Sequence, residues 1–150
     1  MSYQVELITL EPQPAAVVRG QVEQGQIAGF LGAAFGEVMR FLTAQGKAPS
    51  GPPFGRYRPV EGGFQVTAGF PVTDPIAPKG RVEADLLPGG LAASVVHRGD
   101  YGAVGAAYDA LYGWLSATGH VATGEPWESY LDQPDVNQPR TLVLMPCAAG

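Results

Sequence analysis

The feature that most constrains the fold of this sequence is an internal repeat. The segment that runs from Phe41 to Gly46 is echoed by the segment from Trp114 to Gly119. The echo keeps one constant spacing through three further pairs, which are Gly51 with Gly124, Pro53 with Pro126 and Tyr57 with Tyr130. A register shared by glycines, a proline and aromatic residues is hard to obtain by chance. We therefore interpret the chain as two copies of one structural unit.

The two copies are predicted to cover residues 3–72 and 81–147, with a linker at 73–80, and to form a single domain over 1–150. Each copy has the pattern strand, strand, helix, strand, strand. In the first copy we expect strands at 3–8, 15–22, 54–58 and 64–72 and a helix at 27–45. In the second copy we expect strands at 81–87, 91–97, 127–131 and 140–145 and a helix at 101–117.

Apolar residues at helical spacing support both helices. In the first helix they are Ile27, Leu31, Ala34, Phe35, Val38 and Leu42, and in the second they are Val104, Tyr108, Leu111, Tyr112 and Leu115. Gly46 is a plausible stop for the first helix, and Asp100 can cap the start of the second. Antiparallel strands with a helix on one face predict an α+β fold. Two such copies would meet about a pseudo-two-fold axis, and the cleft between them is the natural place for a ligand.

Composition and charge limit the classes of molecule that this chain is expected to bind. The chain has 21 glycines and 14 prolines among 150 residues, which indicates many turns, while 45% hydrophobic and 15% charged residues argue against disorder. Nine lysines and arginines against 14 acidic residues give a net charge of −5, and the basic residues are scattered. We therefore expect no direct nucleic-acid binding, because no basic stripe could neutralise a phosphate backbone. An acidic protein attracts cations more readily.

Other classes of site and location are also disfavoured. Cys147 is the only cysteine, so no intrachain disulfide can form, which fits a cytoplasmic protein. His97 and His120 lack partners at metal-ligand spacing, so we expect no metal and no cofactor. No apolar run approaches about 18 residues, and the start lacks the features of a secretory signal, so we expect no membrane contact.

Glu128 is the strongest candidate for a functional residue. Strand alternation places Glu128 and Tyr130 on one face, with Trp127 on the other. The repeat equivalent of Tyr130 is Tyr57, but the equivalent of Glu128 is Gly55, so only one copy carries the carboxylate. An acid among aromatic residues could hold an organic cation. Alternatively, Glu128 lies on a solvated strand face or pairs with an arginine.

Tyrosines near the second helix are further candidates. Tyr101 follows the expected helix cap and is well placed to face a cleft. Tyr108 also belongs to the candidate ligand-binding residues, although a tyrosine in the apolar stripe of a helix is more typical of the core. The glycines in this region match neither a dinucleotide-binding motif nor a phosphate loop, so a nucleotide site is not expected.

Six motifs together resemble a known family. They are GPPFGRY at 51–57, FPV at 70–72, HRGDY at 97–101, AYDAL at 107–111, GEPWESYL at 124–131 and RT at 140–141. The chain resembles the GyrI-like small-molecule-binding domains, which share their fold with the effector-binding domains of multidrug-responsive and AraC-type bacterial regulators. The resemblance implies an SHS2-like duplication of strand–helix–strand–strand units, with a ligand in the groove between them.

The resemblance also implies site residues and a function. The buried acidic residue of the family falls on Glu128, and the aromatic residues that line its groove fall on Tyr57, Phe70, Tyr101, Trp127 and Tyr130. No DNA-binding segment precedes Tyr3, so we expect a stand-alone binding protein for hydrophobic, cationic or planar aromatic molecules. The first alternative is a hydrolase of cyclopropane-containing genotoxins that uses Glu128 as general base and Tyr101 to stabilise charge. The second is an inhibitor that binds a macromolecule such as DNA gyrase, or a protein that binds a regulator.

Overall fold

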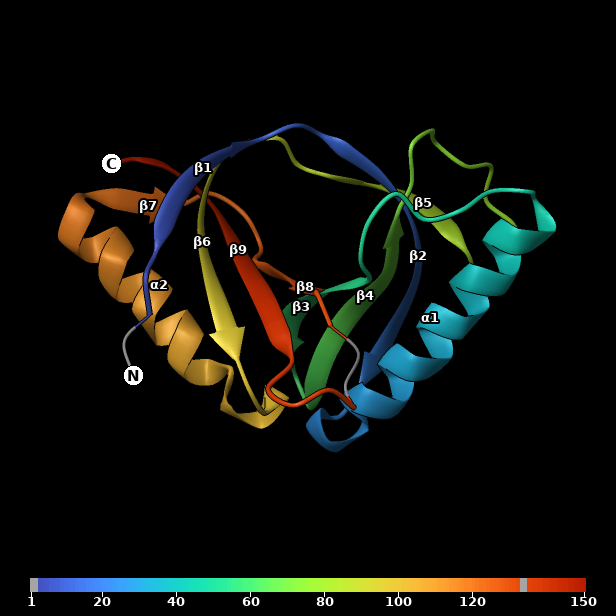
Figure 1. Ribbon diagram of the computed structural model, residues 1–150, viewed down its shortest axis with the longest axis horizontal. Coiled ribbons are helices and arrows are strands. Elements are labelled where there is room, and N and C mark those ends of the chain that lie inside the picture. The colour runs from blue at the N-terminus through green and yellow to red at the C-terminus, as the bar shows by residue number, and fades with distance from the viewer. Residues whose placement is uncertain (1–2, 133–134) are drawn as a thin grey trace. The chain divides into compact units, whose positions relative to one another are not determined.

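Antiparallel strands and two long helices build the chain, of which the computed structural model describes residues 3–132 and 135–150. Contacts divide these residues into two units. Unit 1 contains the residues up to Glu11 and those from Pro88 onward, and unit 2 contains Pro12–Leu87. The predicted α+β class is confirmed, because each unit packs one long helix against antiparallel strands (Figure 1).

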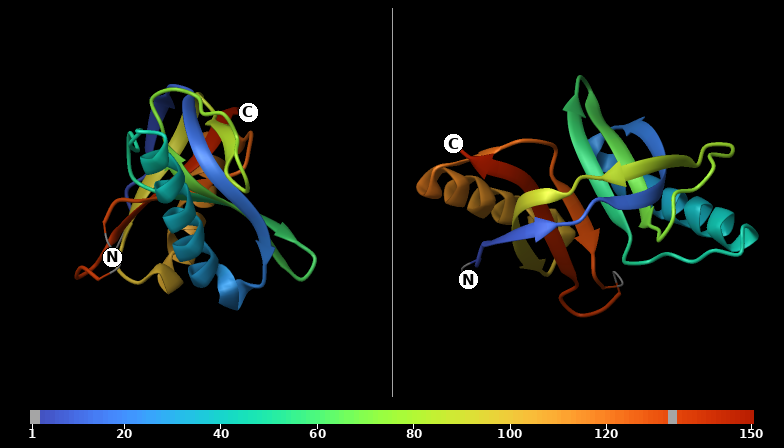
Figure 2. Two further views of the ribbon diagram at one scale, coloured as in Figure 1. Left: turned by 90° about the vertical axis from the view of Figure 1, so that its right-hand side faces the viewer. Right: turned by 90° about the horizontal axis from the view of Figure 1, so that it is seen from above.

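Unit 2 contains four strands and the helix α1. The elements are β2 (Gln13–Val22), a short 3-10 turn η1 (Gln24–Gln26), α1 (Ile27–Ala44), β3 (Phe54–Val60), β4 (Gly63–Pro71) and β5 (Glu83–Leu87). Its strands lie in the order β3-β4-β2-β5, and every pair is antiparallel. The helix α1 lies against β2 and β4, as the views in Figure 2 also show.

The core of unit 2 follows the predicted alternation. The side chains of Val66, Ala68 and Phe70 on β4 are buried beneath α1, which contributes Val38 and Leu42. The helix presents these residues on one face because they recur at helical spacing, and the strand presents them on one face because they alternate. Burial of this face is the main source of stability for the unit.

Unit 1 has the same kind of architecture with one additional short strand. Its elements are β1 (Glu6–Leu10), β6 (Gly90–Arg98), a 3-10 turn η2 (Tyr101–Ala103), α2 (Gly105–Thr118), β7 (His120–Ala122), β8 (Trp127–Tyr130) and β9 (Arg140–Ala149). Strands β1, β6, β9 and β8 pair in that order, and β7 also pairs with β9. The sequence pattern did not predict β7, which has only three residues and no resolvable alternation.

The core of unit 1 lies between α2 and the sheet. Leu111 and Leu115 of α2 are buried against Val95 and Val143, as the helical spacing predicted. Tyr112, which was predicted to lie along this apolar stripe, is instead 53% exposed, so this expectation is wrong. The buried face of the helix is centred on Ala107, Leu111 and Leu115, and a residue one position past Leu111 is turned away from that line.

The first strand of each predicted copy pairs outside its own copy. β1 belongs to the first copy in sequence but pairs with β6 in unit 1, from Glu6 opposite Ser94 to Leu10 opposite Gly90. β5 belongs to the second copy but pairs with β2 in unit 2. Figure 1 shows β1, drawn in blue, alongside the yellow β6. Each unit thus takes one edge strand from the other half of the sequence.

Glycines end both long helices. Gly46 and Gly119 have φ angles of 68° and 74°, a left-handed conformation that costs glycine little because it has no Cβ. The helix start near Asp100 differs from the prediction, since the Asp100 carboxylate accepts a hydrogen bond from the backbone N–H of Gly102 and caps the 3-10 turn η2. α2 itself begins at Gly105.

One segment, Gln24–Ala44, is long and apolar enough to cross a membrane by length and composition, with a mean hydropathy of 1.3. A core helix of a globular unit passes the same test. α1 places Ala34, Val38 and Leu42 in the core of unit 2, and its Glu37 forms an ion pair with Arg81. These contacts show that one face of α1 packs within the unit, while 17% of the apolar window is buried.

Candidate functional site

The strand β8 positions Glu128 in unit 1. Glu128 lies opposite Val143 of β9, and residues directly opposite in an antiparallel pair point to the same face of the sheet. Val143 is fully buried in the core beneath α2, so the Glu128 side chain points to the helix-covered face. Tyr130 is two residues further along the strand and shares this face, as predicted.

Two tyrosine hydroxyls hold the Glu128 carboxylate. The hydroxyl of Tyr108, from α2, donates to Oε2 over 2.7 Å, and the hydroxyl of Tyr130 donates to Oε1 over 3.0 Å. Both carboxylate oxygens therefore accept a hydrogen bond from a neutral donor. Within the described chain, Glu128 forms no ion pair. The alternative that Glu128 pairs with an arginine is not what the structure shows.

Burial raises the pKa of Glu128 above its ordinary value of 4.5. The hydrogen bonds from Tyr108 and Tyr130 and the charge of His97 act in the opposite direction and lower this pKa, but burial has the larger effect. A low-dielectric environment penalises the charged form, while donors that point at the carboxylate favour it. The site thus holds a partly buried acid whose charged form is penalised by burial and favoured by two hydrogen-bond donors.

Tyr101 extends the aromatic surroundings of Glu128. Its ring meets the ring of Tyr130 edge to face, with centroids 5.7 Å apart and an interplanar angle of 71°. Burial, and then the charge of Asp132, raise the pKa of the Tyr101 hydroxyl, so this group stays protonated at neutral pH. The structure therefore brings together four of the predicted residues, which are Glu128, Tyr108, Tyr130 and Tyr101.

A buried histidine lies close enough to this cluster to influence the pKa of Glu128, and it was not predicted as part of the site. His97 of β6 is 3% exposed, and its Nε2 is 2.8 Å from the carbonyl oxygen of Asp100. Because a carbonyl oxygen only accepts, Nε2 carries a hydrogen, and Nδ1 lies 2.8 Å from the Tyr3 hydroxyl. The rings of Tyr3 and His97 also stack. No local pattern could link these two residues, since 94 positions separate them.

The other predicted site residues pack within the units to which they belong. Trp127 is 4% exposed and lies opposite Leu144, on the other side of β8 from Glu128. Phe70 is buried in the core of unit 2, where its ring meets that of Phe35 edge to face. Tyr57 of β3 packs against the same core. Among the described residues, no group of three or more His, Cys, Asp or Glu side chains could hold a metal ion.

Unit 1 thus holds a partly buried carboxylate between two tyrosine hydroxyls. In line with this geometry, the GyrI-like small molecule binding domain family matches residues 3–147. The chain belongs to this family, which confirms the resemblance seen in the sequence. No curated protein matches the chain.

Solved structures with the same fold include three relatives. The first is EcmrR, seen in a cryo-EM complex with DNA. It is 22% identical to this chain with a TM-score of 0.86, and the match covers 99% of this chain and 58% of the EcmrR chain. A crystal structure of the EcmrR C-terminal domain alone is 20% identical with a TM-score of 0.81, and this match covers 100% of both chains.

The other two relatives are more distant. SAV2435 bound to tetraphenylphosphonium is 18% identical with a TM-score of 0.64, over 99% of this chain and 94% of that one. A protein from Listeria innocua described as a hydrolase is 14% identical with a TM-score of 0.69, over 97% and 92% of the two chains. At these identities the likeness shows the fold alone.

Proposed function

We propose that this domain binds hydrophobic organic cations and that the Glu128 carboxylate is their charge anchor. One observation carries the proposal: a partly buried carboxylate is held by two tyrosine hydroxyls and forms no ion pair within the described chain. Burial of such a group costs free energy that a cation can offset. A ligand with a positive charge would therefore gain from a site that is already desolvated and oriented.

The surroundings of Glu128 favour a cation whose charge is spread over apolar surface. Such a cation is weakly hydrated and loses little when it leaves water, whereas a compact ammonium group loses more. The rings of Tyr101, Tyr108 and Tyr130 offer aromatic faces and edges near the carboxylate, and each cation–π contact contributes about 0.5–2 kcal/mol. The structural relative SAV2435, which binds tetraphenylphosphonium, supports this class of ligand.

The proposal rests on Glu128 and these three tyrosines. Contributions from Tyr57, Phe70 and Trp127, and a groove between the two copies, stay predictions. The same holds for the stand-alone nature of the chain, its cytoplasmic location and a protein partner such as a topoisomerase or a regulator.

Titration with tetraphenylphosphonium at neutral pH tests the anchor. We expect E128Q to weaken binding about tenfold or more, because it removes the charge but keeps the size of the side chain. E125Q, which removes one charge three residues away, is the matched control and should bind like the wild type. Tetraphenylborate, which has a similar shape and the opposite charge, should not lose affinity in E128Q. Equal affinities of E128Q and the wild type for the phosphonium cation would contradict the proposal.

A hydrolase is the second candidate, and the raised pKa of Glu128 favours it because a general base works best with a pKa nearer to neutrality. In that function Glu128 would activate water, and the Tyr101 hydroxyl would stabilise the developing charge. The structural relative described as a hydrolase supports this candidate. Incubation with a cyclopropane-containing genotoxin, followed by mass spectrometry, tests it. A product one water heavier that forms with the wild type and not with E128Q would favour the enzyme.

A further inference from the structure

A cavity in unit 1 is lined by residues of β6, by Leu142 of β9 and by residues at the start of the chain, and several of these residues point to the face of the sheet opposite to Glu128. Its volume is about 360 Å³, and its lining includes Ser94, Val96 and Leu142. These three residues alternate with Val95 and Val143, which point to the helix-covered face that Glu128 shares. Val95 and Tyr3 also line the cavity, which therefore reaches the edge of the sheet where β1 no longer pairs with β6, but Ser94, Val96 and Leu142 lie on the face away from Glu128.

The cavity forms where the pairing between β1 and β6 ends. Their pairing runs from Gly90 only as far as Ser94, opposite Glu6, whereas β6 continues to Arg98. Residues 3–5 turn toward the helix side instead, where the Tyr3 hydroxyl contacts His97 and Val5 packs against the core. The gap between residues 3–4 and the last part of β6 is the cavity, and the Tyr3–His97 contact fixes one of its walls.

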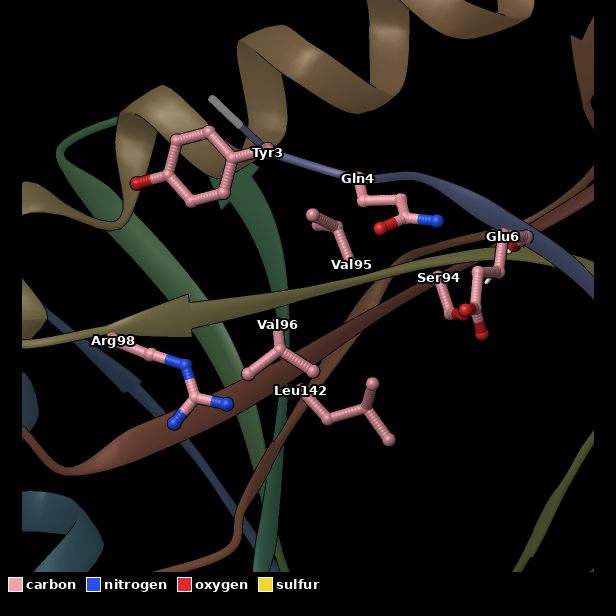
Figure 3. Close-up of a pocket in the computed structure, with 8 residues that line it drawn as sticks. All are labelled: Tyr3, Gln4, Glu6, Ser94, Val95, Val96, Arg98 and Leu142. Carbon is pink, nitrogen blue, oxygen red and sulfur yellow. Dashed lines mark hydrogen bonds between the residues drawn. The ribbon is translucent and has the colours of Figure 1, made fainter. Parts of the chain in front are cut away.

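Two opposite charges mark the ends of this cavity. Figure 3 shows Glu6 beside Ser94 at one end and Arg98 at the other, with Val96 and Leu142 between them. Within the described residues neither Glu6 nor Arg98 takes part in an ion pair, although the charge of Arg98 reaches Asp132 and lowers its pKa. Both charged side chains are thus available to a ligand.

The spacing of the polar groups defines the size of the ligand. Ser94 and Arg98 are four residues apart on one strand, which corresponds to roughly 13 Å. An extended tripeptide spans roughly 10 Å between its terminal groups, and the flexible Glu6 and Arg98 side chains cover the remainder. The Ser94 hydroxyl donates to the backbone carbonyl of Glu6 over 3.3 Å, so its oxygen can still accept a hydrogen bond from the ligand.

From these features we propose a second binding site, lined by Glu6, Ser94, Val96, Arg98 and Leu142, for a short zwitterionic molecule of about tripeptide length. The ligand lies along β6 with its ammonium group at Glu6 and its carboxylate at Arg98, where a guanidinium can bind both oxygens. Its middle part covers Val96, which is 37% exposed, and Leu142.

Binding of trialanine to the full chain, followed by amide chemical shifts, tests this site. We expect saturable binding with a dissociation constant of about 0.1–1 mM, from the usual affinity per atom of a ligand this size. The largest shifts should lie in β6 at residues 94–98. The same titration in saturating tetraphenylphosphonium should give the same affinity, because the two sites are on opposite faces. If tetraphenylphosphonium does not bind at all, the Glu128 proposal fails and the peptide result still stands.

End-blocked peptides and charge variants identify the contacts. E6Q should weaken the binding of trialanine about fivefold but should leave N-acetyl-trialanine at wild-type affinity, because the blocked peptide has no ammonium group. R98Q should weaken trialanine to the same extent but should leave trialanine amide, which has no carboxylate, at wild-type affinity. E11Q and R58Q, which remove the same charges elsewhere, are the matched controls. Absence of saturable binding, competition by tetraphenylphosphonium, or equal loss for free and blocked peptides would overturn the proposal.

Discussion

The two units share an architecture but differ in where they place polar groups. In unit 1, Glu128 lies opposite Val143 of the core, and the equivalent strand of unit 2 places Gly55 opposite the core residue Ala68. The buried polar side chains found in the described chain, Ser94, His97 and Thr141, all belong to unit 1. The core side of unit 2 is apolar throughout its buried side chains.

Acidic residues in unit 2 have partners that Glu128 lacks. Asp85 forms ion pairs of 3.3 Å with both Arg19 and Arg56, and Glu83 forms one of 3.0 Å with Arg19. By register, Arg19 and Arg56 lie opposite Thr67, on the face away from α1. The comparison teaches that one scaffold can use its carboxylates in two ways. In unit 2 Asp85 and Glu83 balance arginines of the chain, whereas Glu128 in unit 1 has no ion-pair partner among the described residues, which is what the proposed cation site requires.

The largest expected effect tests whether the cores of the two units contribute equally to the free energy of unfolding. Leu42 and Leu115 are equivalent in the repeat and are 0% and 4% exposed. Truncation of either to alanine should reduce the free energy of unfolding by about 2–5 kcal/mol, as for other buried leucines. Urea denaturation measures this loss. T43A and S116A, the exposed neighbours, should change it by about 0.5 kcal/mol or less. A large loss of stability in only one of the two leucine variants would show that the two cores are not equivalent.

A smaller effect concerns what the buried Glu128 carboxylate costs the stability of the fold. Because burial raises the folded-state pKa of Glu128 above 4.5, its ionised form destabilises the folded protein above that raised pKa. E128Q should therefore melt at a higher temperature than the wild type at pH 7. The difference should shrink as the pH falls below about 4.5, where the carboxyl is protonated in both the folded and unfolded states. A melting temperature of E128Q below that of the wild type at pH 7 would show that the carboxylate stabilises the fold.

The smallest effect separates the two tyrosine donors. Y108F and Y130F each remove a hydrogen bond that lowers the pKa of Glu128, so each should move its titration to higher pH. Y108F should cause the larger shift, because its bond is 2.7 Å against 3.0 Å for Tyr130. NMR of the labelled Glu128 carboxyl carbon measures the titration. Y112F, on the exposed side of α2, is the control and should leave it unchanged. A shift to lower pH in either variant would contradict the geometry.

Local periodicity accounts for what the sequence could predict. The stripe from Ala34 to Leu42 placed α1, and alternation placed Glu128 and Tyr130 on one face, because both signals repeat within a few residues. The exchange of β1 and β5 between the halves could not be predicted this way, since strand pairing depends on distant residues. The Tyr3–His97 contact is hidden for the same reason. Tyr112 was misplaced because a large ring at the edge of an apolar stripe fits either face of a helix.

The most direct test of an ionised Glu128 anchor is the affinity for tetraphenylphosphonium across pH, measured by calorimetry on the wild type and E128Q. The charge of this ligand does not change with pH, so any titration belongs to the protein. In the wild type the affinity should rise as Glu128 ionises, with a midpoint above 4.5 because burial raises the pKa of its carboxyl. In E128Q this rise should be absent. An affinity that is independent of pH in the wild type, or that rises equally in E128Q, would contradict the role of Glu128.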